Sequence, residues 1–113
     1  MTNTPTIHER ITADMRAAMK LRNITTVATL RTLMAAIDNA SAVAVTSEHV
    51  STVGRSSDVP RRVLTEHDVR EVLRADAASR ATAAEEFERG GQVTHAAKLR
   101  QEVELIRAYI GER

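Results

Sequence analysis

The longest uninterrupted helical pattern in the chain covers residues 65–91, and it constrains the fold more than any other feature. Neither proline nor glycine interrupts it before Gly90 and Gly91, which are suited to ending a helix. Thr65 can act as the N-cap, with Asp68 as the acidic member of a capping box. At about 1.5 Å per residue, such a helix would extend for roughly 39 Å, beyond the width of a small domain. The next segment must therefore fold back after the glycines and cover its apolar stripe.

Residues 94–110 have the pattern expected of that returning helix, and Gly111 is suited to ending it. Their apolar positions repeat at alternating spacings of three and four, which is typical of a helical seam. The seam consists of Ala96, Leu99, Val103, Ile106 and Ile110, with Leu105 and Tyr109 beside it. The two segments predict an antiparallel helical hairpin, with Phe87 buried near its turn.

Two shorter helices are expected before the hairpin, one from Thr6 to the break at Asn23 and one over residues 24–40. Thr6 and Glu9 match a capping box at the start of the first helix. Apolar residues at helical spacing form a stripe on each helix. These are Ile7, Ile11, Met15, Ala18 and Met19 on the first, and Val27, Leu30, Leu33, Met34 and Ile37 on the second. We therefore expect an all-α fold, in which one domain of residues 1–113 packs two shorter helices on a long antiparallel hairpin.

Residues 41–62 are rich in Ser, Thr and Val, contain Gly54 and Pro60, and predict a long surface loop. Val43 and Val45 could form a short extended piece within it. A functional loop and a tolerated insertion both fit this composition. We favour the insertion, because closing a longer loop costs little free energy.

Composition argues against several functional classes. The chain has 16 basic and 15 acidic residues and no cysteine, and aromatic residues make up only 2%. This balance gives no general attraction to nucleic acid, and so few aromatics disfavour a base-stacking platform. The sequence contains no apolar run long enough to span a membrane and no signal-peptide pattern. We expect a cytoplasmic protein.

The sequence does not predict a stand-alone active site. The four histidines are not spaced for a shared metal ion, and neither a glycine-rich phosphate loop nor a nucleophile elbow is present. We therefore expect no catalytic residue, no cofactor and no metal.

Asp76 and Arg80 fall inside the apolar stripe of the long helix, which is an unusual position for charged residues. They are four residues apart with the acid first, the favourable order for a helical ion pair. One interpretation is a structural pair that fixes helix register, which we favour. The other is a site that faces a ligand.

Four segments of the chain resemble, in the right order, the GatB/YqeY family. They are ITADMRAAMKLRN at residues 11–23, ATLRTLMAAIDNA at 28–40, LTEHDVREVLRADAASRATAAEEFERGG at 64–91 and LRQEVELIRAYI at 99–110. The resemblance covers almost the whole chain outside residues 41–62. The chain is similar to the first, helical domain of a YqeY-like protein, and by this resemblance we expect the tail domain to be absent.

The resemblance implies an accessory module related to the tRNA-dependent amidotransferase, a carbon–nitrogen ligase with glutamine as amide donor. Such a module would bind tRNA or amidotransferase subunits. Because the residues show no stand-alone active site, we do not expect it to catalyse the reaction itself. The candidate contacts are Arg16, Lys20, Arg31 and Arg80. A candidate structural ionic cluster, matching charged positions of the family, consists of Arg31, Asp76, Arg80 and Glu102. The alternative is a structural or protein–protein interaction domain with no nucleic-acid role, including self-association through the hairpin.

Overall fold

The structure is a computed structural model that describes residues 4–48 and 64–111, with side chains described for all of these except residues 43–48. Within these ranges the fold is all-α, with four helices and no strand, which confirms the predicted fold class. The helices are α1 (Ile7–Lys20), α2 (Ile24–Glu48), α3 (Glu66–Arg89) and α4 (Val93–Ile110).

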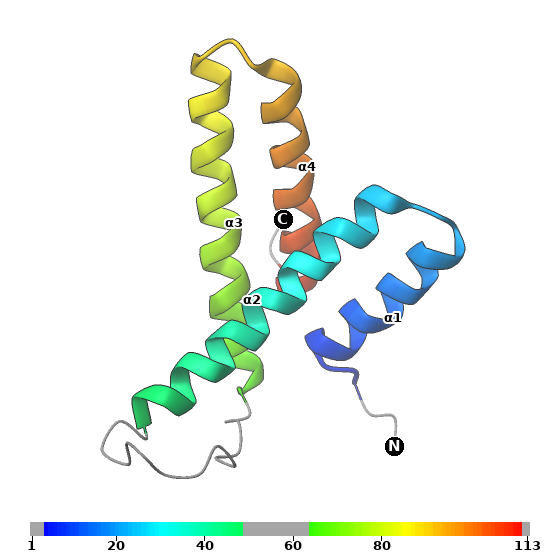
Figure 1. Cartoon of the computed structure of the whole chain (residues 1–113), viewed down its shortest axis with the longest axis vertical. Helices are drawn as coiled ribbons and strands as arrows, with labels where there is room; N and C mark the ends of the chain where they lie inside the picture. The colour runs from blue at the N-terminus through cyan, green and yellow to red at the C-terminus, as the bar shows by residue number, and fades with distance from the viewer. Residues whose placement is uncertain (1–3, 49–63, 112–113) are drawn as a thin grey trace.

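The four helices form two antiparallel hairpins (Figure 1). α3 packs most extensively against α4, α1 packs against α2, and α2 also contacts α3. In Figure 1, α2 crosses near the base of the α3–α4 hairpin, and the α1–α2 turn extends away to the side. The hairpin expected from residues 65–110 is therefore present. α2 connects the two hairpins, because it packs against α1 and also contacts α3.

Side-chain caps start α1 and α3 where the sequence predicts them. The Oγ1 atom of Thr6 accepts a hydrogen bond from the backbone N–H of Glu9 at 3.1 Å, and the Glu9 carboxylate accepts one from the N–H of Thr6 at 2.8 Å. Thr65 and Asp68 make the same reciprocal pair at the start of α3. Each capping box satisfies two backbone donors that would otherwise have no partner at a helix end.

The α3–α4 turn is a Schellman motif. The N–H of Gln92 donates to the carbonyl oxygen of Phe87 at 2.8 Å, and the N–H of Gly91 donates to that of Glu88 at 3.1 Å. Gly91 has φ 82°, the left-handed conformation that glycine adopts without steric cost. The double glycine therefore ends α3 as expected and reverses the chain into α4.

The α1–α2 turn has the same hydrogen-bond pattern. The N–H of Asn23 donates to the carbonyl oxygen of Ala18 at 2.9 Å, and the N–H of Arg22 donates to that of Met19 at 3.0 Å. Here the left-handed position, with φ 58°, is occupied by Arg22. Asn23 also begins α2, because its Oδ1 atom accepts a hydrogen bond from the N–H of Thr26 at 3.2 Å.

All four helices contribute to one apolar core. Its buried members are Ile7, Ile11, Leu30, Leu33, Ile37, Val69, Leu73, Ala77, Val103, Ile106, Tyr109 and Ile110. The expectation for two residues was wrong. Met19 lies in the last turn of α1, one residue beyond buried Ala18, and its side chain is 46% exposed. Phe87 lies close to the hairpin turn and is only partly buried, with its ring stacked on that of His95 at a centroid distance of 4.0 Å.

The expected loop over residues 41–62 starts too early, because α2 continues to Glu48. Residues 41–48 are therefore helical, and Val43 and Val45 belong to α2 rather than to an extended piece. Neither glycine nor proline interrupts this segment, and its alanines favour a helix. α2 has 25 residues against 24 for α3, so it exceeds α3 in length. The rest of the expected loop, residues 49–62, lies outside the described residues.

Tyr109 joins the end of α4 to α1. Its hydroxyl donates a hydrogen bond to the Asp14 carboxylate at 2.5 Å, and its carbonyl oxygen accepts one from Nη1 of Arg10 at 3.2 Å. The Arg10 guanidinium also lies over the Tyr109 ring, 5.2 Å from its centroid. Burial raises the pKa of the Tyr109 hydroxyl above its usual value, and the hydrogen bond to Asp14 adds to this effect.

Candidate functional site

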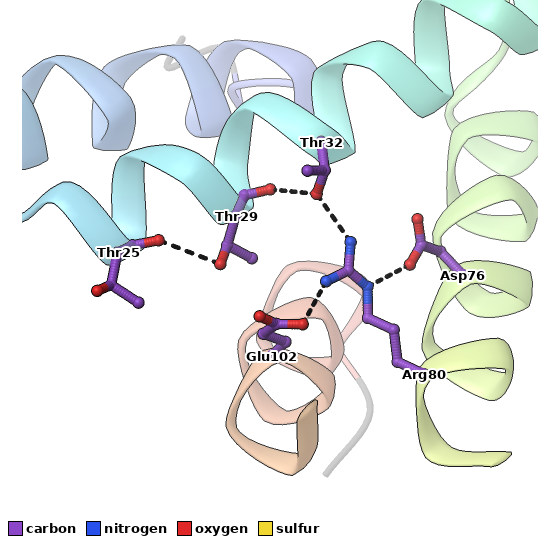
Figure 2. A network of polar contacts seen from close by, with 6 residues as sticks. All are labelled: Thr25, Thr29, Thr32, Asp76, Arg80 and Glu102. Atoms are coloured by element: carbon purple, nitrogen blue, oxygen red, sulfur yellow. Dashed lines mark hydrogen bonds and ion pairs between the residues drawn. The ribbon is translucent and has the colours of Figure 1, made fainter. Parts of the chain in front are cut away.

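Arg80 is the centre of a polar network that joins three helices (Figure 2). Its Nε atom donates to Asp76 Oδ1 at 2.5 Å, and its Nη1 atom donates to Glu102 Oε1 at 2.5 Å. Its Nη2 atom donates to Oγ1 of Thr32 at 2.7 Å. All three guanidinium nitrogens therefore have a partner, and the partners come from α3, α4 and α2.

The helices bring these side chains together in different ways. Asp76 precedes Arg80 by one turn of α3, so their pairing is local. Glu102 reaches Arg80 because α4 lies antiparallel to α3. The side chains of Arg80, Asp76 and Glu102 are 17%, 21% and 15% exposed. A network this far removed from water is screened less than a surface ion pair.

The charge of Arg80 is stabilised inside the network. Burial acts to lower the pKa of its guanidinium, but the hydrogen bonds and negative charges of Asp76 and Glu102 outweigh burial. The pKa of Arg80 is consequently raised above its already high usual value. Arg80 is a permanent cation held between two acidic side chains, and it is unsuited to exchanging protons.

Three threonines on α2 lead up to Arg80 (Figure 2). Thr32 Oγ1 donates to the carbonyl oxygen of Thr29 at 2.6 Å while it accepts from Arg80. Thr29 Oγ1 in turn donates to the carbonyl oxygen of Thr25 at 3.2 Å, and Thr29 is buried. Because its proton is committed to the backbone, the Thr32 hydroxyl presents lone pairs to the guanidinium.

Two adjoining surface hollows lie beside the network, with volumes of about 220 and 210 Å³. Both are lined by Thr25, Thr29, Lys98 and Glu102, and Arg80 forms part of the wall of the first. The positive charges of Arg80 and Lys98 are matched by the negative charges of Glu102, which lines both hollows, and of Asp76, which is paired with Arg80. This balance gives the hollows no net attraction for an anion such as phosphate.

The structure brings together three of the four residues of the ionic cluster proposed from the sequence. Asp76, Arg80 and Glu102 meet in the network, whereas Arg31 is exposed and its neighbour Thr32 makes the contact from α2. Successive helical residues point about 100° apart, so Arg31 and Thr32 face different directions.

The remaining candidates lie on the surface. Arg16 and Lys20 are exposed on α1. The four candidate binding cations therefore do not converge, since Arg80 is enclosed by its partners and the other three lie on the α1–α2 hairpin.

Sequence reasoning missed the threonines. Thr25, Thr29 and Thr32 follow one another at spacings of four and three, which places their side chains on one face of a helix. That spacing, on a helix predicted to pack against the Asp76–Arg80 pair, is the signal that could have found them.

Two further properties concern the described ranges only. Residues 4–48 and 64–111 contain no group of histidine and acidic side chains arranged to hold a metal ion. None of the helices in these ranges has the length and hydropathy of a membrane span.

Comparison with protein families gives a match to the model described as Yqey-like protein, over residues 8–113. The chain belongs to the YqeY-like family. The four helices described for this YqeY-like chain within residues 4–48 and 64–111 fall inside the matched residues, except the first residue of α1. The Arg80 network is also inside the match. A comparison with curated proteins gives no match.

Proposed function

We propose that this YqeY-like chain is a non-catalytic accessory module of tRNA-dependent amidation, in which glutamine is the amide donor. It acts by binding tRNA or a subunit of the amidotransferase. Family membership and the sequence resemblance to GatB support the association with amidation. The module would work in the cytoplasm beside the enzyme that it assists.

The proposal that the module is not catalytic is supported by the hydrogen bonds of Arg80. Its guanidinium has hydrogen-bonded partners on every nitrogen, and two of them, Asp76 and Glu102, are carboxylates. A phosphate or a reacting carboxylate would have to displace both acids from a mostly buried position. We therefore assign the network a structural role, in which it fixes the register of α2, α3 and α4.

Partner binding then depends on the exposed cations of the α1–α2 hairpin. Arg16, Lys20 and Arg31 are accessible, and such side chains contact phosphate or acidic protein surfaces without rearranging the core. A second candidate function is an interaction domain with no nucleic-acid role. It is favoured by the exposed apolar side chains of Leu21 and Ile24 on the same hairpin, because phosphate binding does not require them.

Retention on the immobilised 113-residue chain tests these functions. We expect tRNA or amidotransferase subunits of the source organism to be retained, and a combined Arg16→Ala, Lys20→Ala and Arg31→Ala variant to lose them. Arg89→Ala, an exposed arginine at the other hairpin, is the matched control. If tRNA is retained in a salt-sensitive way and amidotransferase subunits are not, the result favours tRNA as the binding partner. Retention of neither, with self-association by sedimentation, would favour the interaction domain and reject the amidation module.

A further inference from the structure

The α1–α2 turn and the helix ends beside it expose three large apolar side chains to solvent. Leu21 and Ile24 are each 81% exposed, and Met19 is 46% exposed. Single exposed aliphatic residues are common on protein surfaces, but three within six consecutive residues form a patch. Of the described large apolar side chains, only Val93 in the other turn has comparable exposure, at 61%.

The same turn lies in the middle of a purely basic stretch. Residues 15–37 contain no Asp or Glu, although the whole chain has 15 acidic residues against 16 basic ones. The basic residues of this stretch are Arg16, Lys20, Arg22 and Arg31. No acidic residue therefore adjoins the apolar patch along the sequence, and the local excess of positive charge favours a negatively charged partner surface.

The backbone of the turn is both fixed and strained. Arg22 has φ 58°, a left-handed conformation that is uncommon for residues other than glycine and often marks functional positions. Asn23 holds the turn from both sides, since its N–H closes α1 on Ala18 and its side chain caps α2 at Thr26. The apolar patch is thus presented in one preformed arrangement, which reduces the entropy lost when a partner binds.

We propose that this basic tip, consisting of Met19, Lys20, Leu21, Arg22 and Ile24, is a docking surface for a protein partner. The partner presents an apolar strip bordered by carboxylates, as an acidic amphipathic helix does. Both halves of the tip are then used, because the strip covers Leu21 and Ile24 while the carboxylates meet Lys20 and Arg22.

A nucleic acid uses only half of this surface. Phosphate contacts take up the cations but leave the aliphatic side chains in water. The inference rests on the proposed binding role of the module, and goes further by naming the surface and the chemistry of its partner.

The binding of two labelled helical peptides to the 113-residue chain tests the proposal. One has leucines on one face with glutamates along both borders, and its twin has lysines in place of the glutamates. We expect fluorescence anisotropy to give an affinity for the glutamate peptide about tenfold or more above that for the lysine peptide, and weaker at high salt. The combined Leu21→Ser and Ile24→Ser change should reduce that affinity about tenfold or more, whereas Val93→Ser should leave it unchanged.

Circular dichroism of each variant verifies the fold, which these exposed substitutions should leave intact. Absence of glutamate-peptide binding, or binding that the serine variant retains, overturns the proposal. It is also overturned if tRNA or anionic phospholipid vesicles bind, lose their affinity on Arg22→Glu and keep it in the serine variant, because the tip is then a phosphate site.

The retention experiment described under the proposed function, repeated with the serine variant, separates this inference from the proposed function. If amidotransferase subunits bind the serine variant as well as the parent, the docking surface is elsewhere while the module function stands. If no amidation component binds but the glutamate peptide does, the proposed function fails and the tip assignment holds.

Discussion

Arg22 and Gly91 occupy the same position of the same turn in the two helical hairpins. Each donates its N–H to the carbonyl oxygen three residues earlier, and in each case the next N–H reaches back five residues. Their φ angles are 58° and 82°, both left-handed. Glycine adopts this conformation freely, whereas a residue with a Cβ atom loses about 1–2 kcal/mol. The two turns therefore share one hydrogen-bond pattern and differ in backbone strain.

Replacing Arg22 by glycine should stabilise the protein. We expect Arg22→Gly to raise the free energy of unfolding by about 0.5–1 kcal/mol, because the relief of strain exceeds the extra flexibility of glycine in the unfolded chain. Urea unfolding followed by circular dichroism measures this difference. A clear loss of stability would mean that the Arg22 side chain makes a favourable contact that outweighs its backbone strain.

The opposite substitution in the other turn is the matched test of the backbone argument. Gly91→Ala should lower the free energy of unfolding by about 1 kcal/mol. A Cβ atom at Gly91 would have nothing within 4 Å, so crowding does not contribute to the expected loss. An unchanged urea midpoint would show that this turn tolerates a side chain and would remove the reason to call Arg22 strained.

Helix boundaries were predictable where a capping side chain sets them. Thr6 and Thr65 carry their own signal, because each is followed three residues later by the acid that completes the box. The end of α2 has no such signal. Residues 41–48 mix alanine with β-branched and hydroxyl residues, whose intrinsic preferences are weak, so the composition indicated a loop where the structure has a helix.

Local spacing alone predicted only the Asp76–Arg80 pair of the candidate site, and Glu102 was included only through the family resemblance. Asp76 and Arg80 lie one turn apart, so their proximity follows from helical geometry alone. The approach of Glu102 depends on the register of the α3–α4 hairpin. The choice of Thr32 over Arg31 depends on the rotation of α2 about its own axis, which the contacts between helices determine.

Phe87 should contribute moderately to stability, because it is partly buried and not in the core. We expect Phe87→Ala to lower the free energy of unfolding by about 1–2 kcal/mol, below the roughly 3–5 kcal/mol typical of a fully buried phenylalanine. A double-mutant cycle with His95→Ala should give a coupling of about 0.5–1.5 kcal/mol for the stacked rings. Additive effects of the two substitutions would argue against the stack in solution.

Tyr109 should make the protein sensitive to alkali. Its pKa is raised in the folded state, so its contribution to stability is fully present below its unfolded pKa of about 10. The contribution is lost as the pH rises from there through the folded pKa. Because Tyr109 is the only tyrosine and the chain has no tryptophan, tyrosinate absorbance reports this group alone.

We expect the absorbance of the folded chain to rise at distinctly higher pH than in concentrated urea. Tyr109→Phe should remove this part of the decline in stability above about pH 10. Superimposable titrations in the folded and unfolded states would contradict the partly buried hydrogen bond from Tyr109 to Asp14.

The structural assignment of the Arg80 network predicts a specific pattern of losses and recovery. Arg80→Met keeps the apolar stem but leaves Asp76 and Glu102 without their cation in a mostly buried position. Breaking a buried pair from one side costs about 3–5 kcal/mol, and the residual exposure of these groups reduces the expected loss to about 2–4 kcal/mol. Arg31→Met, on the exposed face of α2, is the matched control and should change stability by less than about 0.5 kcal/mol.

Neutralising both acids tests whether stranded charge causes the loss. Adding Asp76→Asn and Glu102→Gln to Arg80→Met should recover part of the stability, because no buried carboxylate is then left without a cation. A purely steric role for Arg80 predicts no recovery, since the two added amides do not restore its volume. If Arg80→Met instead unfolds at the same urea concentration as the parent and loses salt-sensitive retention of tRNA, Arg80 belongs to a binding surface. The network would then open in solution, and its two carboxylates would compete with phosphate for the guanidinium rather than hold three helices in register.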